Sequence, residues 1–266
     1  MQPLRHATFA LALAAACMPL ASAARQPLHL VSDEQLAQMG QEEFAKMKAT
    51  QKMSTDPRQQ AAVQCVVNSL RATLPAPYST QAWEVRVFVD DTPNAFALPG
   101  GKVGVNTGMF RIVQSQDELA AVLGHEMGHV VARHTNERVS RQLVAQTGLQ
   151  VLGAIASRHA SATTTRGLVN AAGGGAQLFL LLPNSREQES EADALGQRYM
   201  AQAGFDPARA VTLWQHMEAA SGARAPQFLS THPNPANRLR DLSTRAPSLQ
   251  PLARSARAAG HSPKCF

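Results

Sequence analysis

The apolar and polar positions of the chain predict a short group of strands in its first half. Residues 83–89 alternate apolar and polar side chains, as a half-buried strand does. Residues 94–108 contain two further apolar runs, one on each side of the turn Pro99-Gly100-Gly101. We therefore expect a small β-sheet, and the edge of such a sheet can pair with an extended peptide.

Helices are expected on both sides of these strands, because capping residues precede the apolar segments. Ser32 opens a helix that ends near residue 50, and Asp56-Pro57 opens another that ends near residue 74. These two helices form a helical N-terminal part, residues 30–75. Downstream, we expect helices at residues 184–204, 206–220 and 234–244, with a loop at 226–233.

The most informative apolar pattern lies in residues 119–134, where an apolar stripe at helical spacing predicts a helix seated in the core. Ser115 and Glu118 precede it with the S-x-x-E spacing of a capping box. Gly128 interrupts this helix, and a glycine there costs about 1 kcal/mol relative to alanine. We expect the backbone of another element to pack closely against it.

Candidate chemistry is concentrated in the same helix. His125-Glu126-Met127-Gly128-His129 is an H-E-x-x-H motif. Side chains four residues apart lie on one face of a helix, so His125 and His129 can bind one metal ion. Glu126 is then placed to act as a general base on a water molecule. The motif indicates a zinc hydrolase.

A catalytic zinc needs a third protein ligand, and an acidic segment downstream offers several candidates. Glu189 and Asp193 are four residues apart, so one can bind the ion while the other supports a histidine ligand. Glu187 and Glu191 form the same kind of pair on a neighbouring face. Spacing alone leaves both pairs open.

Length and composition indicate one sizeable domain. The chain has 266 residues, and its 44% hydrophobic and 17% charged residues are typical of a globular protein. Residues 1–23 have the charge, apolar run and A-x-A ending of a secretory signal peptide. We expect an exported, periplasmic protein with a domain at residues 24–246 and a C-terminal tail at residues 247–266.

The cysteines fit this picture. Cys17 lies in the signal region, where it is either removed with the signal or lipidated as in a bacterial lipoprotein. Cleavage after residue 23 leaves Cys65 and Cys265, an even pair that is a disulfide candidate in an exported chain.

Charge narrows the range of partners. The formal net charge is +6, and removal of residues 1–23 takes away Arg5 and no acid. No basic run is interleaved with aromatic residues, so a nucleic-acid partner is not expected. Arg245, Arg254 and Arg257 allow a peripheral contact with an anionic membrane. The sequence carries no signal for the oligomeric state.

Four motifs in order resemble the M48 family of zinc metallopeptidases, in its Oma1-like and bacterial periplasmic branch. They are the segments at residues 94–101, 123–134, 185–193 and 230–235. The resemblance covers roughly residues 30 to 245. It implies an α+β, mainly helical domain of the zincin (gluzincin) type, with the small β-sheet beside the active-site helix and one Zn²⁺ per chain.

The family pattern also implies roles for individual residues. Glu189 becomes the third zinc ligand and Asp193 the support for a histidine ligand. His232 either donates to the developing oxyanion or occupies the metal at rest, and Arg238 follows in the same segment. The expected substrate-binding strand consists of Val103, Gly104, Val105 and Asn106, which follow the turn at residues 99–101.

The resulting hypothesis is a zinc metalloendopeptidase that cleaves peptide bonds in misfolded or damaged cell-envelope proteins. An outer-membrane assembly contact is compatible with it. The alternative is a periplasmic chaperone or assembly factor with a largely silent zinc site. Its client-binding surface would be the segment rich in Ala, Gly and Leu at residues 145–183, whose middle part, residues 157–176, reads as a lid, a membrane contact or a helical hairpin.

Overall fold

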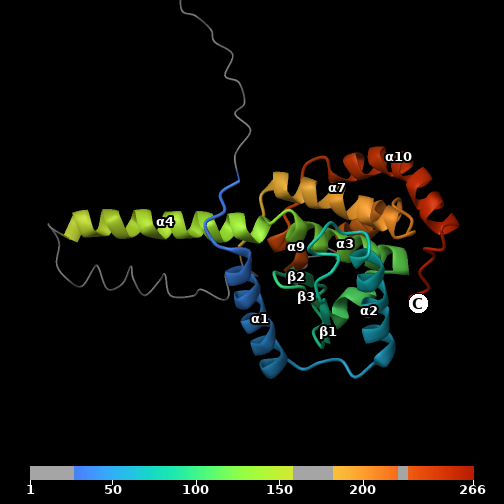
Figure 1. The fold of residues 1–266 in the computed structure, drawn as a ribbon, viewed down its shortest axis with the longest axis horizontal. Coiled ribbons are helices and arrows are strands. Elements are labelled where there is room, and N and C mark those ends of the chain that lie inside the picture. The colour runs from blue at the N-terminus through green and yellow to red at the C-terminus, as the bar shows by residue number, and fades with distance from the viewer. Residues whose placement is uncertain (1–26, 158–181, 221–226) are drawn as a thin grey trace, which may run out of the picture.

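The computed structural model describes residues 27–157, 182–220 and 227–266 (Figure 1). The expected signal peptide with Cys17 and nearly all of residues 157–176 lie outside these ranges. The described elements are α1 (Asp33–Thr50), α2 (Pro57–Arg71), β1 (Glu84–Phe88), β2 (Ala95–Leu98), β3 (Lys102–Asn106), the 3-10 helix η1 (Thr107–Arg111), α3 (Gln116–Val131), α4 (His134–Ser157), α7 (Arg186–Gln202), α8 (Arg209–Ala219), α9 (Gln227–Thr231) and α10 (Arg238–Ala258). The expected fold class, mainly helical with a small sheet, is confirmed.

The three strands form a mixed sheet in the order β1-β3-β2. β1 runs parallel to β3, and β2 runs antiparallel to it after a tight turn. Gly100 and Gly101 make that turn with φ values of 79° and 71°, a conformation that favours glycine. β3 is therefore the central strand.

The sheet order corrects the expected substrate strand. The backbone of Val103, Gly104, Val105 and Asn106 belongs to β3, which is hydrogen-bonded to a strand on each side. Its N–H and C=O groups are already paired and cannot accept a peptide. Among the described strands, β2 is the outer strand on the side of α3, so β2 is the edge that a peptide can join.

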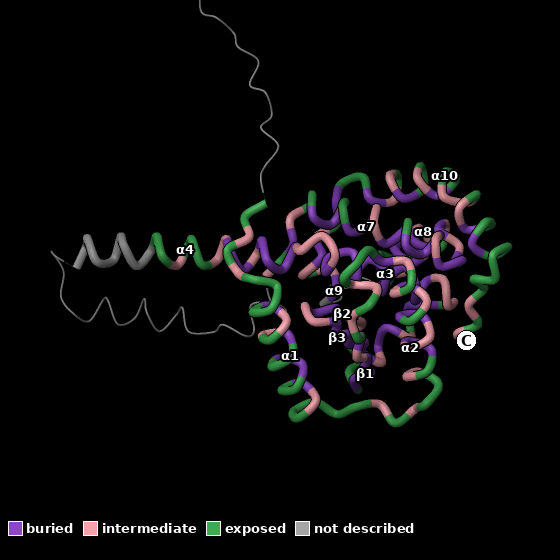
Figure 2. Tube along the Cα trace, in the orientation of Figure 1, coloured by how far each residue is buried: buried purple, intermediate pink, exposed green. Residues whose placement is uncertain are grey.

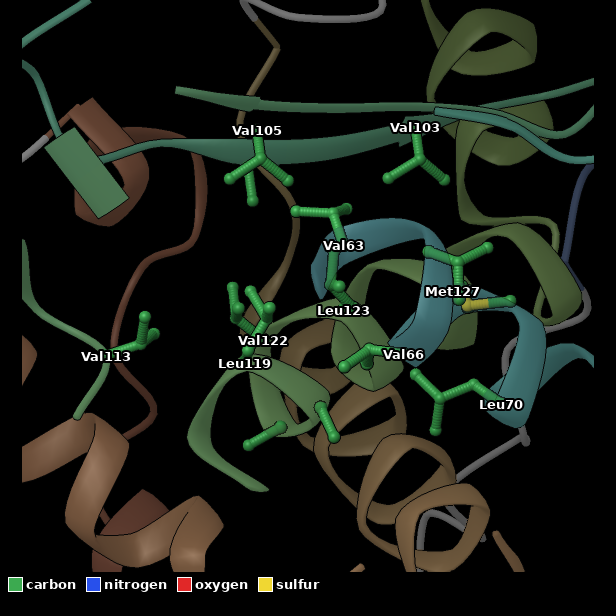
Figure 3. Packing of buried hydrophobic residues seen from close by; sticks show 14 of the residues in the cluster. Val63, Val66, Leu70, Val103, Val105, Val113, Leu119, Val122, Leu123 and Met127 are labelled. Atoms are coloured by element: carbon green, nitrogen blue, oxygen red, sulfur yellow. The ribbon is translucent and has the colours of Figure 1, made fainter. Parts of the chain in front are cut away.

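Helix α3 occupies the centre of the molecule, and every residue from Glu118 to Val130 is buried (Figure 2). The sheet, α2, α7 and α8 all pack against it. Figure 3 shows apolar side chains of β3, α2 and α3 meeting in this core. The labelled residues there include Val63, Val66, Leu70, Val103, Val105, Leu119, Leu123 and Met127.

Glycines bring α3 and α7 close together. A Cβ on Gly128 would lie 3.0 Å from the carbonyl oxygen of Ala192, which confirms the expected backbone contact. A Cβ on Gly196 would lie 2.6 Å from the backbone nitrogen of His125. The two helices can approach this closely only because these positions carry no side chain.

Helix α1 covers one part of the sheet, and helix α4 extends away from the body of the molecule. Phe44 of α1 packs edge-on against Phe88 and Phe96, whose rings stack on each other. The first turn of α4 is buried against the core, and the rest of this helix projects from the body (Figure 1). Within the described residues, we find no helix that has both the length and the apolar character to cross a membrane.

The C-terminal part differs from expectation. Residues 226–233 were expected to form a loop, but they contain α9. The last helix was expected to end near residue 244, but α10 continues through Pro247 and Pro251 to Ala258. Both prolines are exposed, so the carbonyl groups that they leave unpaired face water. The opposite face of α10 is buried through Arg238, Leu242, Ala246, Ala253 and Ala256.

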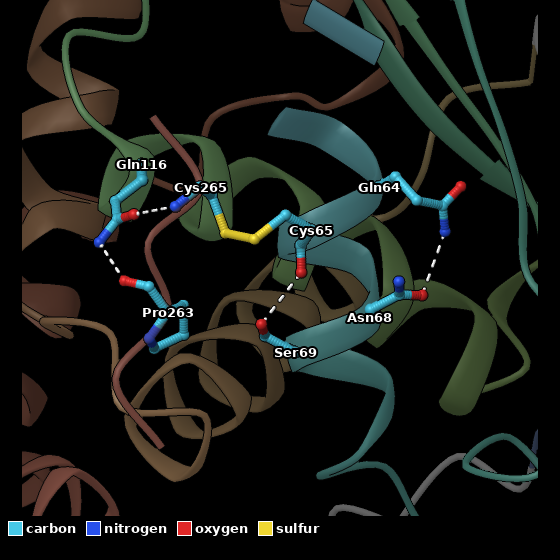
Figure 4. The surroundings of a disulfide bond; sticks show 7 residues. All are labelled: Gln64, Cys65, Asn68, Ser69, Gln116, Pro263 and Cys265. Carbon is cyan, nitrogen blue, oxygen red and sulfur yellow. Dashed lines mark hydrogen bonds between the residues drawn. A yellow bond between two sulfur atoms is a disulfide. The ribbon is translucent and has the colours of Figure 1, made fainter. Parts of the chain in front are cut away.

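A disulfide fixes the end of the chain. Cys65 of α2 is bonded to Cys265, with a Cα–Cα distance of 5.5 Å (Figure 4). The side chain of Gln116 accepts from the backbone N–H of Cys265 and donates to the carbonyl of Pro263. Residues 247–266 are therefore part of the folded body and not a separate tail.

Candidate metal centre

The H-E-x-x-H motif lies on the buried helix α3. His125, Glu126 and His129 are only 2%, 4% and 4% exposed. Ser115 caps the helix by accepting from the N–H of Glu118, as expected. The reciprocal hydrogen bond of the expected capping box, from the Ser115 N–H to the Glu118 carboxylate, is not seen among the described residues. The Glu118 carboxylate accepts from the N–H of Gln114 instead.

Helix α7 brings its carboxylates to the same place. Ser185 and Gln188 form a capping box that starts the helix. Glu189 and Asp193 are buried and face α3, whereas Glu187 and Glu191 are exposed. Of the two pairs that spacing left open, only Glu189 and Asp193 are thus buried beside the histidines of α3.

Four side chains converge on one point. His125, His129, Glu189 and His232 each offer a ligand atom, and these atoms all lie within 4.8 Å of one another. His125 Nε2 lies 3.0 Å from His129 Nε2 and 3.2 Å from His232 Nδ1. The oxygens of Glu189 lie 3.1–3.3 Å from the same three nitrogens.

These separations fit a small tetrahedral metal ion. Nitrogen and oxygen ligands about 2.0–2.1 Å from a tetrahedral zinc stand about 3.3 Å apart from one another. Three imidazole nitrogens and a carboxylate oxygen are ligand types that zinc binds. The residues therefore fit a metal ion, with His232 in the fourth position.

Polar partners orient the cluster. Asp193 Oδ1 lies 2.8 Å from His125 Nδ1, so Nε2 of this histidine points to the cluster. Arg238 donates to Asp193 from Nε at 2.7 Å and to Glu189 from Nη2 at 2.6 Å. Its guanidinium also lies over the ring of Trp214, 3.7 Å from the centroid. Arg238 thus holds both carboxylates in place.

Burial and charge set the protonation states. Burial alone would raise the pKa of Glu189, but a hydrogen bond with His125, the charge of His125, and hydrogen bonds with His129 and His232 hold this pKa well below its usual range. Burial raises the pKa of Glu126, which moves it toward the range useful for a general base. Oε1 of Glu126 is buried without a hydrogen-bond partner, and His232 Nε2 lies 3.5 Å from it.

A small cleft of about 40 Å³ leads to this centre. Residues 94–98 of the β2 segment form one wall, and Glu126, His129 and His232 line the same cleft. The outer strand of the sheet therefore lies beside the candidate base.

Sequence reasoning missed several residues of the site. Phe228 stacks on the His232 ring with centroids 4.3 Å apart, and Trp214 meets the His125 ring edge-on at 5.7 Å. Asn184 Nδ2 lies 3.3 Å from His232 Nδ1. His134 lies in the motif stretch but was given no role, and Glu191 was considered only as part of the alternative acidic pair. Of these residues, only His134 and Glu191 lie in sequence segments that had already been singled out.

The sequence model of Peptidase family M48 matches residues 57–246, and this range holds every residue of the metal centre. The chain belongs to peptidase family M48. The M48 match begins at α2 and ends inside α10, so α1 and the disulfide end of the chain lie outside it.

Two groups of curated relatives are similar to this M48 chain, the OMA1 metalloendopeptidases and the beta-barrel assembly-enhancing proteases. It is 43% identical over 170 residues to the mitochondrial metalloendopeptidase OMA1 of Schizosaccharomyces pombe, which covers 63% of this chain and 48% of the relative. It is 38% identical to the OMA1 of Arabidopsis thaliana over 58% of this chain and 29% of the relative. It is 35% identical to the beta-barrel assembly-enhancing protease of Yersinia pestis over 61% of this chain and 34% of the relative. The chain thus spans less than half the length of these M48 relatives.

Proposed function

We propose that this chain is a zinc-dependent endopeptidase. The observation that carries the proposal is the convergence of His125, His129 and Glu189 beside Glu126, whose Oε1 is buried 3.5 Å from His232 Nε2. Three ligands from two helices suit a catalytic zinc, because such a site leaves one position for the reacting groups. The relatives named as metalloendopeptidases and proteases support the same activity.

The residues of the site have separate roles in the proposed reaction. When bound, zinc would supply a Lewis acid that polarises the scissile carbonyl and acidifies water. Glu126 takes a proton from the attacking water and delivers it to the leaving amine. Asp193 and Arg238 hold His125 and Glu189 in the geometry that keeps the metal.

The substrate backbone is expected to join β2. This strand is the outer one on the side of α3, and residues 94–98 line the cleft with Glu126. An extended peptide added to β2 would bring its carbonyl group past the candidate base. This arrangement favours unfolded segments as substrates.

His232 is proposed to close the site at rest. Its Nδ1 lies 3.1 Å from Glu189 and takes the fourth position of the cluster, while its Nε2 faces Glu126. A substrate and a water molecule need that position, so the His232 imidazole must leave before hydrolysis. His232 follows α9 in the segment that connects α8 to α10. Among the described residues, this segment contributes no other side chain to the cluster.

The proposed substrates are misfolded or damaged proteins of the cell envelope, and the proposed location is the periplasm. The positive start, apolar run and A-x-A ending of residues 1–23 support export. The assembly-enhancing protease of Yersinia pestis, by its name, acts in β-barrel assembly, which supports a role near outer-membrane assembly for this chain as well.

The test measures zinc content and casein cleavage of the purified protein, with and without a chelator, beside Glu126→Gln. We expect one zinc per chain in both proteins, cleavage only by the wild type, and loss of cleavage with chelator. Glu126→Gln should reduce cleavage roughly 10²- to 10⁴-fold.

Two outcomes would contradict the proposal. If Glu126→Gln cleaves casein at the wild-type rate, Glu126 is not the base. If zinc binds but neither casein nor an unfolded envelope protein is cleaved, while both proteins promote client folding equally, the chaperone or assembly-factor function replaces the peptidase.

A further inference from the structure

The histidine ligands of the metal centre have different partners. His125 contacts a carboxylate, Asp193, through Nδ1. His129 instead contacts another histidine, with its Nδ1 2.8 Å from Nδ1 of His134. His134 is 3% exposed, so no bulk water competes for this contact.

The chain makes a special turn to bring these two rings together. Residues five apart in a continuous helix point about 140° away from each other and do not meet. Here α3 ends at Val131, and Arg133 adopts a left-handed conformation with φ 58°. α4 then starts at His134, so its first side chain returns beneath His129. A non-glycine residue in this conformation is uncommon and marks a constrained turn.

The contact between the two rings fixes the position of one proton. If His129 binds a metal through Nε2, its ring proton must be on Nδ1. Two Nδ1 atoms 2.8 Å apart can share only one proton, so Nδ1 of His134 must be the acceptor. The ring proton of His134 then sits on Nε2.

A carboxylate stands where that proton points. Oε2 of Glu191 lies 3.3 Å from His134 Nε2. Glu191 comes two residues after Glu189 on α7, so the helix that provides a metal ligand also supports the second histidine. All donors and acceptors from Glu191 to His129 Nε2 are consistent with one arrangement of protons.

We propose that His134 is a positioning residue that holds His129 in the tautomer and ring orientation that bind the metal. Glu191 in turn fixes the tautomer of His134. The inference rests on the proposed function, because it requires a metal at His129 Nε2. It gives a role to Glu191, a member of the alternative pair that spacing left open: Glu191 supports the metal site without touching it.

The test compares His134→Leu, which removes the acceptor, with His134→Asn, whose side-chain oxygen can take the place of Nδ1. Zinc affinity is measured by chelator competition, and unfolding of the metal-free proteins is measured separately. His261→Ala is the matched control, because His261 is exposed and lies outside the cluster. We expect His134→Leu to weaken zinc binding roughly 10- to 100-fold, and His134→Asn to recover most of the loss. His261→Ala should bind like the wild type.

A measurement on the wild type keeps the test independent of folding defects. In the zinc-loaded protein, ¹⁵N shifts of the imidazoles should report His134 protonated on Nε2 and His129 protonated on Nδ1. A His134 protonated on Nδ1 overturns the inference, and so does a His134→Leu protein that folds and binds zinc as tightly as the wild type. A wild-type protein that binds no zinc would instead overturn the proposed function.

Discussion

The fourth position of the metal cluster is held by a residue from a connecting segment, whereas the other three ligands come from the long helices α3 and α7. His232 is stacked on Phe228 and faces Glu126, so it is held on two sides. Its departure is therefore a step with its own free-energy cost. This difference between the ligands leads to a prediction for one substitution.

His232→Ala should retain zinc through the three remaining ligands and should cleave unfolded substrate faster than the wild type. If His232 stabilises the closed site by about 1.4 kcal/mol, its removal should raise the cleavage rate about tenfold. Cleavage rates at equal zinc content measure this effect. A loss of cleavage with zinc retained would indicate that His232 acts on the developing oxyanion instead.

Protons and zinc compete at His125. Burial alone would lower its pKa, but hydrogen bonds with Asp193 and Glu189 raise the pKa to about 10. In the metal-free protein His125 therefore carries a proton at neutral pH, and zinc must displace it. Zinc affinity should accordingly fall about tenfold for each pH unit as the pH is lowered from 8 to 6.

Calorimetry in buffers with different ionisation enthalpies measures this proton release directly. We expect about one proton per zinc from His125. Binding heats that are the same in every buffer would show that His125 is already neutral before zinc binds.

At the scale of elements, the close contact of α3 and α7 sets the geometry of the ligands. Gly196→Ala would place a Cβ 2.6 Å from the His125 backbone nitrogen. The helices must separate, which draws Glu189 away from His125 and His129. We expect a loss of about 1–3 kcal/mol in the free energy of unfolding, together with weaker zinc binding.

Gly148→Ala is the control for this substitution, because a Cβ there meets nothing within 4 Å. Denaturant unfolding and chelator competition should show no loss for this variant. If Gly196→Ala matches it in both measurements, the contact between α3 and α7 is not what positions the ligands.

The elements also show what the sequence could and could not predict. Caps at Ser32, Asp56 and Ser115 predicted helix starts, because a side-chain oxygen pairs with a backbone N–H only a few residues away. The order of the strands was not predictable in this way. Alternation at residues 83–89 indicates a strand but does not say that its partner is β3.

Distant contacts explain the other differences. Pro247 and Pro251 indicate a helix end by local rules, but packing of α10 against α7 and α8 overrides them. In the metal site, the motif revealed His125, Glu126 and His129. Trp214 and Phe228, as ordinary apolar residues of α8 and α9, carried no sign of their contact with the ligand rings.

At the scale of the whole molecule, the disulfide joins α2 to the end of the chain across a sequence separation of 200 residues. Closing so long a loop restricts the unfolded chain. Cys65→Ser/Cys265→Ser should therefore lose roughly 2–5 kcal/mol in the free energy of unfolding. Denaturant midpoints of the wild type, with and without reductant, provide the comparison. The double variant should be insensitive to reductant.

Zinc binding by the double variant should be unchanged under native conditions, because Cys65 and Cys265 are outside the metal cluster. If the wild type unfolds at the same denaturant concentration with and without reductant, the disulfide does not contribute to stability.

The same disulfide makes a covalent ring of the chain between Cys65 and Cys265. Glu126 and all four residues of the metal cluster lie inside this ring. One backbone cut within it, including a cut made by another copy of the same protein, leaves the two pieces joined. A nicked molecule would keep its ligands together and run as a single species until it is reduced. A protein proposed to cut polypeptides is thereby protected from losing half of its own active site to a single cleavage.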